Sequence, residues 1–406
     1  MTGSRITVAA LILCIAEPAS AAQSESATVN TAVREFNVKD YGAKGDNSTI
    51  DTPAVAAAFL AANRVASKGL PAVVIFPPGI YVSCGPGINL RHAISVRGAG
   101  SYQSMIRIPD TCSGDLFAWD DVWYGSSFNS NPPKLDRLQV GVNIEGIGCF
   151  GDRNSEEQQN FLMFYDRVDA LYVRDVTCEY LRGRFIFVGQ LGATTQAFMR
   201  ESNFDKIRCF HCGDHDAPVV EFSSIGGGDV TNTNKINQVD IYAPHGVGMW
   251  LHGAFGQGGL DGRQIRIEGL ENGNVDTDLL LIGDSTSLAS TNNIDLQQVS
   301  LINPYVGHAA IHLMASDRKF QSYQIKIQGG IGGGAPKGKG IVIDSGAARN
   351  VSFDLRGIHT LDTNVFIGAN VGPIYLNGYG QESSWSWTVD VTSNKNINIA
   401  SWQRRN

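Results

Sequence analysis

The sequence lacks several features that would place it in well-known protein classes. Beyond residue 22 it has no apolar run of about 18 residues, so we expect no membrane-spanning helix. Charged residues make up 17% of the chain and the net charge is −7, which argues against nucleic-acid binding because that function usually needs a basic face. The 46 glycines follow no G-X-Y period, which excludes a collagen-like chain. A hydrophobic content of 43% is enough for a large core.

The first 22 residues have the composition of an export signal. Arg5 supplies a positive charge, an apolar stretch follows it, and Ala19-Ser20-Ala21 provides a small-residue cleavage site. We therefore predict that residues 1–22 are a signal peptide and that the protein is secreted or periplasmic. Disulfide bonds are stable in such compartments.

Long helical patterns are almost absent, and a short apolar pattern takes their place. The pattern apolar-x-apolar-x-x-apolar recurs about every 30 residues, and each copy is followed by a second short run rich in Val and Ile. A unit of this size cannot bury its apolar face alone, so copies must stack. The pattern predicts a β-solenoid with one coil per repeat. The middle residues of the copies are Ile144, Val173, Phe204, Ile236, Ile267, Leu296, Ile327 and Leu355.

The segment ahead of the repeats has a different character. Asp51–Ser67 is rich in alanine with helical spacing, and Thr52 is placed to cap a helix that starts with Pro53. We expect this helix to cover the open end of the solenoid, as stacked repeats require. The predicted organisation is one structural domain: a signal peptide (1–22), the cap and first coils (23–110), further coils (111–380) and a C-terminal cap (381–406).

Three N-terminal segments together resemble the pectate-lyase-like superfamily, which includes polygalacturonases, rhamnogalacturonases and alginate epimerases. They are FNVKDYGAKGDNSTIDTPAVAAAFLAA (36–62), VVIFPPGIYVS (73–83) and ISVRGAG (94–100). The close resemblance covers residues 33–110. It implies an all-β fold, a right-handed parallel β-helix of about nine coils with an N-terminal helical cap. Because this fold serves several chemistries, the resemblance does not define the reaction.

Cysteines are few, and three of them follow the repeat. Cys149, Cys178 and Cys209 occupy the same offset in successive coils, so stacking would bring them into one column. They form either a buried thiol ladder or one disulfide within the column, and Cys84 with Cys112 is a second candidate pair. The C-x-x-C spacing at Cys209 and Cys212 has no second pair, so we expect no zinc site.

The polar loop between the two strands of each coil carries most of the reactive side chains. Five charged or imidazole residues fall one to three positions before the second strand of their coil, and we expect them to line one edge of the solenoid. They are Arg184, Asp216, His245, Asp278 and His308. An edge lined by Arg, Asp and His suits an acidic polysaccharide.

The loop with the highest density of titratable groups reads His211-Cys212-Gly213-Asp214-His215-Asp216. Clustered carboxylates can raise the pKa of one partner, which a general acid requires. Gly213–Ala217 also resembles the paired-aspartate loop of polygalacturonase-type hydrolases, and Pro244-His245-Gly246 resembles their G-H-G motif. The hydrolases' N-T-D motif is missing, since Leu181–Arg184 stands in its place. The predicted catalytic residues are Asp214, Asp216, His245, His215 and His211.

The favoured hypothesis is an exported enzyme that hydrolyses a polysaccharide containing uronic acid. A polysaccharide lyase is the first alternative, with a histidine as base and Arg182, Arg184 or Arg263 neutralising the uronate. The second is a non-catalytic glycan-binding or surface β-helix. Substrate binding is assigned to Arg182, Arg184, Arg263, Asp278 and His308. No metal or cofactor is expected, apart from Ca²⁺ in a lyase. The expected partner is the polysaccharide, and the expected state is a monomer or a homotrimer.

Overall fold

The computed structural model describes residues 33–402 outside a set of shorter segments. The predicted signal peptide, residues 1–22, lies outside them. The described residues belong to one compact unit, Val33–Asn406. The segments left out are 88, 123–140, 190–197, 225–232, 254–258, 271–276, 284–292, 306, 315–324, 333–337, 345–350, 357–362, 369–373, 380–386 and 390–396.

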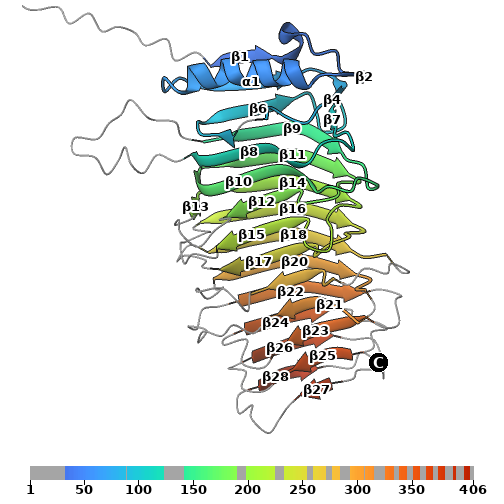
Figure 1. Ribbon diagram of the computed structural model, residues 1–406. Coiled ribbons are helices and arrows are strands. Elements are labelled where there is room, and N and C mark those ends of the chain that lie inside the picture. Colours follow the sequence, from blue (N-terminus) through green and yellow to red (C-terminus); the bar gives the residue numbers. More distant parts are fainter. Residues whose placement is uncertain are drawn as a thin grey trace, which may run out of the picture. The chain divides into compact units, whose positions relative to one another are not determined.

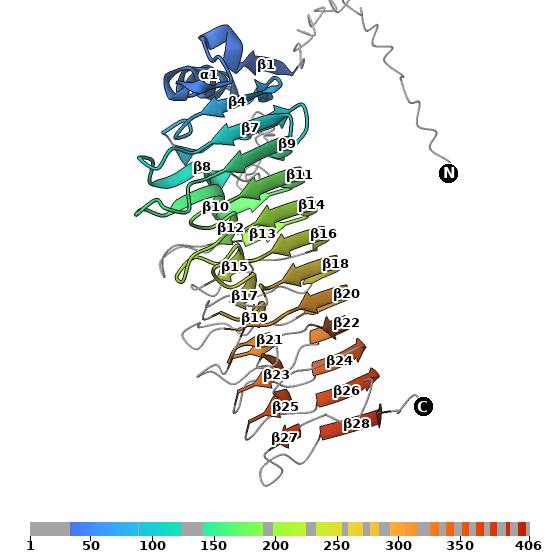
Figure 2. The same cartoon turned by 90° about the vertical axis from the view of Figure 1, so that its right-hand side faces the viewer.

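Two parallel sheets run along the stack, and the chain alternates between them. Within the described residues the first sheet has 16 strands and the second has 12. The strands lie one above another from β1 (Arg34–Asn37) to β28 (Ile397–Trp402), with α1 (Thr52–Ala66) at the β1 end (Figure 1; Figure 2). All pairings between described strands of the two sheets are parallel, and most keep one register, which confirms the predicted parallel β-helix.

The remaining strands of the first sheet are β2 (Asp46–Ile50), β3 (Ala72–Phe76), β4 (Gly79–Val82), β6 (Ile94–Gly98), β7 (Ser104–Arg107), β9 (Asn143–Phe150), β11 (Tyr172–Glu179), β14 (Asn203–Phe210), β16 (Asn234–Tyr242), β18 (Leu260–Glu268), β20 (Ile294–Ile302), β22 (Ile325–Gly332), β24 (Val351–Arg356) and β26 (Ile374–Tyr379). Those of the second sheet are β5 (Asn89–Leu90), β8 (Gly114–Val122), β10 (Gln159–Asp169), β12 (Ile186–Gly189), β13 (Phe198–Arg200), β15 (Val220–Ser224), β17 (Met249–Gly253), β19 (Leu280–Ile282), β21 (Ala309–Leu313), β23 (Lys339–Ile343), β25 (Thr363–Ile367) and β27 (Trp387–Val389). A short 3-10 helix, η1, spans Val38–Tyr41.

Each central coil turns at three corners, and left-handed backbone marks them. One corner precedes the first-sheet strand, one lies inside it and one follows it. Left-handed backbone costs an ordinary residue about 1–2 kcal/mol, so contacts between stacked coils must offset this cost at the corners. Among the described residues, 13 of the 14 non-glycine residues with positive φ stand at these corners: Ala170, Glu201, Thr233 and Asn293; Asp175, Lys206, Gln238, Gln264 and Gln298; Tyr180, His211, Ala243 and Asn303.

The repeat frame is correct for most coils and wrong for two. Ile144, Val173, Phe204, Ile236, Leu296 and Ile327 share one register column, as predicted. Ile267 pairs with Ile241 instead, and Gly262 occupies the anchor position of β18. A Cβ at Gly262 would meet Leu296 Cδ2 at 2.5 Å, so neighbouring side chains already fill that space. In β24 the anchor is Phe353 and not Leu355.

Helix α1 covers the N-terminal end of the coils, as predicted. Its apolar face includes Phe59, which contacts Phe76 and Phe117 at ring-centroid distances of 6.5 and 5.4 Å. The expected cap at Thr52 is wrong, because the N-cap is Asp51 and the hydroxyl of Thr52 accepts a bond from the backbone of Cys84. No helix among the described residues is long and apolar enough to cross a membrane.

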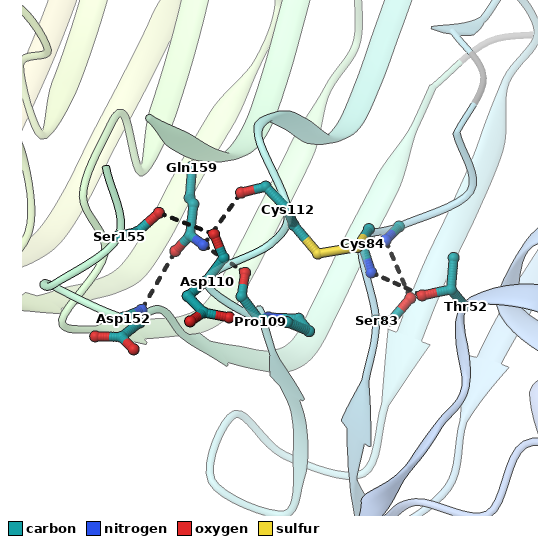
Figure 3. Close-up of a disulfide and its surroundings, with 10 residues drawn as sticks. Thr52, Ser83, Cys84, Pro109, Asp110, Cys112, Asp152, Ser155 and Gln159 are labelled. Carbon is teal, nitrogen blue, oxygen red and sulfur yellow. Dashed lines mark hydrogen bonds between the residues drawn. A yellow bond between two sulfur atoms is a disulfide. The ribbon is translucent and has the colours of Figure 1, made fainter. Parts of the chain in front are cut away.

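Three disulfides link the described cysteines. Cys84 bonds to Cys112, beside the hydrogen bond between Cys84 and Thr52 (Figure 3). Cys149 bonds to Cys178 across adjacent coils, which resolves the predicted column in favour of one disulfide. Cys209 shares the column but bonds to Cys212, three residues along the chain. The C-x-x-C pair is thus a covalent link at the turn after β14.

Candidate functional site

Most of the predicted catalytic residues lie in turns that leave the first sheet and enter the second. These turns follow β9, β11, β14 and β16, and they stack as the strands do. The backbone N–H of Gly213 donates to Leu181 O at 3.0 Å, and that of His245 donates to Cys212 O at 2.7 Å. Side chains from four successive coils are therefore held at one corner by the same ladder that builds the fold.

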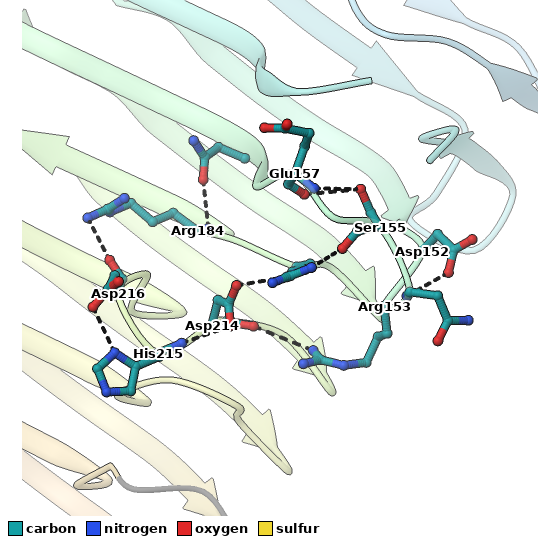
Figure 4. A network of polar contacts seen from close by, with 12 residues as sticks. Asp152, Arg153, Ser155, Glu157, Arg184, Asp214, His215 and Asp216 are labelled. Atoms are coloured by element: carbon teal, nitrogen blue, oxygen red, sulfur yellow. Dashed lines mark hydrogen bonds and ion pairs between the residues drawn. The ribbon is translucent and has the colours of Figure 1, made fainter. Parts of the chain in front are cut away.

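Two arginines bind the turn of Asp214 at this corner, one through the Asp214 carboxylate and the other through backbone carbonyls (Figure 4). Nε of Arg182 donates to Asp214 Oδ2 at 2.8 Å. Nη1 of Arg153 donates to the carbonyls of His211 at 2.5 Å and Gly213 at 3.5 Å. Burial would raise the pKa of Asp214, but the bonds from Arg182 and from the backbone of His215 outweigh it and lower this pKa. Asp214 is therefore an anionic anchor for a guanidinium.

Two histidines from adjacent coils lie beside Arg153. The rings of His211 and His245 are 6.0 Å apart between centroids. Burial, followed by the charge of Arg153, lowers the pKa of His245 to about 4, and the same two causes lower that of His211. Both imidazoles are accordingly neutral near pH 7 and can accept a proton. We call Arg153, Arg182, His211, Asp214 and His245 the corner cluster.

Aromatic side chains adjoin the corner cluster. The ring of Tyr180 stacks on that of His211 at 5.2 Å and 2°, and Tyr242 meets His211 edge-on at 5.8 Å. The hydroxyl of Tyr305 donates to Pro244 O at 2.5 Å, one residue before His245. The corner thus combines cationic, basic and apolar surface.

Asp216 and His215 lie at the exposed tip of the same turn. The backbones of Asp214 and Ala217 exchange two hydrogen bonds of 2.9 and 3.0 Å, which closes the turn. The side chain of Asp216 is 83% exposed and contacts His215 Nδ1 at 2.8 Å. Asp214 and Asp216 lie in one turn, as predicted, but their side chains have different partners.

Arg184 belongs to a second, buried network on the outer side of the second sheet. Its Nε donates to Glu221 Oε2 at 2.6 Å, and Glu221 Oε1 contacts His252 Nε2 at 2.9 Å. Burial would raise the pKa of Glu221, but the bonds from His252 and Arg184 lower it. Nη2 of Arg184 also donates to Asp216 O at 3.3 Å, which joins this network to the turn of Asp214 (Figure 4).

Asp278 and His308 lie further along the stack, in a third group. His312 is held between Asp278 Oδ2 at 2.7 Å and Asp344 Oδ1 at 3.1 Å, while His308 Nδ1 is 3.7 Å from Asp278 Oδ1. Arg263 lies on strand β18, where it is 3.8 Å from Asp261. The predicted substrate-binding residues are thus distributed over separate places, and Arg182 is the one in the corner cluster.

The described residues do not fit a calcium site at this corner. Among them, no group of three or more His, Cys, Asp or Glu side chains is placed to hold a metal ion. Asp214 already binds Arg182 and the backbone of His215. A hollow of about 400 Å³ opens elsewhere, lined by residues that include Ser95, Arg97 and Asn143, and it contains none of the candidate residues.

Several of these residues were not predicted from the sequence. Arg153 follows β9 in a turn with no recognisable motif. Its guanidinium donates a hydrogen bond to the backbone of the turn that follows β14, two coils away. Glu221 lies within the short apolar run Val219–Phe222, and His252 directly follows another such run, Val247–Leu251. Their alternation with apolar neighbours was the available signal, because an outward position in a strand that carries a charge needs a partner.

Comparisons with known proteins find similarity in the N-terminal part of the chain. Residues 35–129 match the family model described as "Rhamnogalacturonase A/epimerase, pectate lyase-like". One segment is 35% identical over 104 residues to "Non-secreted LysM effector LysM19" of Penicillium expansum, which is 23% of this chain and 8% of that protein. Another is 33% identical over 119 residues to "Alginate lyase 7" of Azotobacter vinelandii, which is 28% of this chain and 13% of that protein.

The matched segments span about a tenth of the length of these curated relatives. Among solved structures, the A-module of the mannuronan C-5 epimerase AlgE6 from Azotobacter vinelandii is similar with a TM-score of 0.44 and 15% identity. That match covers 89% of this chain and 99% of the module. Residues 35–129 are thus similar to the pectate-lyase-like family, and the parallel β-helix continues beyond them through the described residues.

Proposed function

We propose that the protein cleaves a polysaccharide containing uronic acid by β-elimination at the corner cluster. One observation carries the proposal: the neutral imidazoles of His211 and His245 lie beside the guanidinium of Arg153, with Arg182 held in the same cluster by Asp214. A base and a cation within one site are what removal of a proton next to a carboxylate requires.

The reaction can be written with the residues of the corner cluster. A guanidinium of Arg153 or Arg182 pairs with the uronate carboxylate, which makes the C5 proton more acidic. A ring nitrogen of His245 accepts that proton, and its electron pair forms the C4=C5 double bond. The C4–O glycosidic bond breaks, and the leaving oxygen takes a proton from solvent or from the histidine. No metal ion enters this scheme.

The partners of Asp214 favour elimination over hydrolysis. An inverting hydrolase needs one carboxyl that is protonated near neutral pH and a second that activates water. Asp214 has a lowered pKa and binds Arg182, so it is better suited to orient that arginine than to donate a proton. Asp216 remains the candidate acid of a hydrolase, with its side chain exposed at the tip of the turn.

Two further observations support an exported enzyme with an acidic glycan as substrate. The partial relatives include a protein named as an alginate lyase, and alginate is a polyuronate. Three disulfides among the described residues are typical of proteins that mature outside the reducing cytosol.

The test is a panel of polyuronates, including alginate and polygalacturonate, incubated with the protein and followed by two signals. Unsaturated uronate absorbance reports elimination, and new reducing ends report any cleavage. We expect both signals to rise together, and we expect His245→Gln to reduce them by about 10²–10⁴-fold. His215→Gln is the matched control, because this histidine lies in the same region with a side chain that is 77% exposed.

Three other outcomes of this experiment would point to a different function or a different site. Reducing ends without unsaturated product would replace elimination by hydrolysis and make Asp216→Asn the decisive variant. Binding without cleavage would identify a glycan-binding protein. Equal loss in His245→Gln and His215→Gln would remove the corner cluster from the mechanism.

A further inference from the structure

We infer that Tyr180, His211 and Tyr242 form a sugar-stacking subsite that binds a pyranose ring of the polysaccharide next to the corner cluster; the inference rests on the proposed function. Tyr180 is 47% exposed, a large exposed aromatic beside the corner cluster. Its ring lies parallel to that of His211 at 5.2 Å, so the imidazole supports one side of it.

The three rings come from three successive coils. The backbone N–H of Tyr180 donates to Phe210 O at 2.9 Å, and that of His211 donates to Tyr242 O at 2.9 Å. Tyr180 and His211 both stand at the corner where the backbone is left-handed, with φ of 55° and 56°. Tyr242 meets His211 at 90° and Phe210 at a centroid distance of 6.4 Å. The rings are thus fixed on the solenoid corner, which lowers the entropy cost of binding.

A sugar ring suits this surface better than a peptide or a nucleic acid does. The C–H face of a pyranose is apolar and packs on an aromatic face, while its hydroxyls remain available to polar groups. Arg153 Nη1 binds the carbonyl of His211, so a guanidinium lies next to the stacked rings. Burial and the charge of Arg153 lower the pKa of His211, and the negative charge of Glu179 opposes them. A uronate carboxylate would therefore face Arg153 and turn away from Glu179.

The experiment compares Tyr180→Asn with Tyr180→Phe and Tyr375→Asn. Asn tolerates left-handed backbone, so Tyr180→Asn removes the ring without penalising the corner. Tyr180→Phe keeps the ring and removes the hydroxyl. Tyr375 on β26 is 49% exposed and serves as the matched control for loss of an exposed tyrosine. Binding of alginate and polygalacturonate is measured by titration calorimetry, with circular dichroism as the check of folding.

We expect Tyr180→Asn to weaken binding about twofold to twelvefold, from an aromatic contact worth about 0.5–1.5 kcal/mol. Tyr180→Phe and Tyr375→Asn should bind like the wild type. The stacking subsite is refuted if a folded Tyr180→Asn binds as well as the wild type, or if Tyr375→Asn weakens binding equally. If the wild type binds no acidic polysaccharide, the proposed function fails and this inference fails with it. If the wild type cleaves the polysaccharide and Tyr180→Asn binds it as tightly as the wild type does, the subsite alone is overturned.

Discussion

Removing the guanidinium of Arg184 tests how the buried network supports the fold. The side chain of Glu221 is 5% exposed and has two partners, Arg184 at 2.6 Å and His252 at 2.9 Å. Arg184→Met keeps an unbranched apolar side chain but removes the guanidinium, which lies over the ring of Phe187 at 5.6 Å. The variant leaves a buried carboxylate with one partner fewer.

We expect Arg184→Met to lower the free energy of unfolding by about 3 kcal/mol, the low end of the usual cost of breaking a buried pair, because His252 still bonds Glu221. Arg174→Met is the control. Arg174 is 46% exposed and pairs with Glu145 on the outside of the first sheet, so its loss should cost less than about 1 kcal/mol. Urea denaturation followed by circular dichroism measures both, with midpoints compared because a stacked fold need not unfold in two states.

The double variant Arg184→Met/Glu221→Gln separates the charge from the packing. Glutamine is neutral and can still bond to His252, and the surroundings include the buried side chains of Met163 and Phe187. We expect the double variant to recover most of the lost stability, because a buried neutral amide does not need a cation. If the double variant is no more stable than Arg184→Met, or if Arg184→Met costs no more than Arg174→Met, the reasoning is refuted.

Two further predictions concern other parts of the stack. Burial lowers the pKa of His312, but its bonds to Asp278 and Asp344 outweigh this effect and raise the pKa to about 9. The contribution of protonated His312 to stability should therefore be complete below about pH 6.5 and disappear as the pH rises through 9. Thermal melts over a pH series should show this decline in the wild type and not in His312→Gln. The Cys149–Cys178 bond closes a longer loop than Cys209–Cys212, with sequence separations of 29 and 3, so replacing the first pair by alanine should cost about 3.5 kcal/mol and replacing the second about 2 kcal/mol; equal losses would contradict the loop-entropy argument.

The fold could be predicted because its periodicity depends on apolar residues at fixed intervals. The core receives one such side chain from each coil, for example Ile144, Val173 and Phe204 in three successive coils, and parallel stacking puts them in register. The frame failed at Gly262, where the anchor has no side chain and Leu296 and Ile265 fill the space. A glycine at an apolar position gives no periodic signal, so the anchor predicted for this coil was Ile267 instead.

The candidate site could be predicted only in part, because contacts across coils depend on side-chain length and direction. The turn containing His211 and Asp214 was recognisable from its density of titratable groups. The bond between Asp214 and Arg182 depends on the direction of the arginine, and the reach of Arg153 over two coils depends on a turn whose geometry no motif encodes. Equal offset from a strand brought Asp278 and His308 of adjacent coils to within 3.7 Å of each other, whereas Arg184 binds Glu221 in a separate network.

The position of the disulfides relates the core to the corner cluster. One interior column of stacked side chains contains Cys149, Cys178, Cys209 and Ile241 in successive coils. Because Ile241 replaces a cysteine there, the column requires only a buried side chain of moderate size at that position. Its two covalent links are confined to the coils from which Arg153, Arg182, His211 and Asp214 project. Catalytic groups must be held to within fractions of an ångström, and loops reach that precision when the elements beneath them are rigid. The Cys209–Cys212 bond closes around His211 itself, which fixes the backbone at the residue that links the aromatic rings to the proposed base.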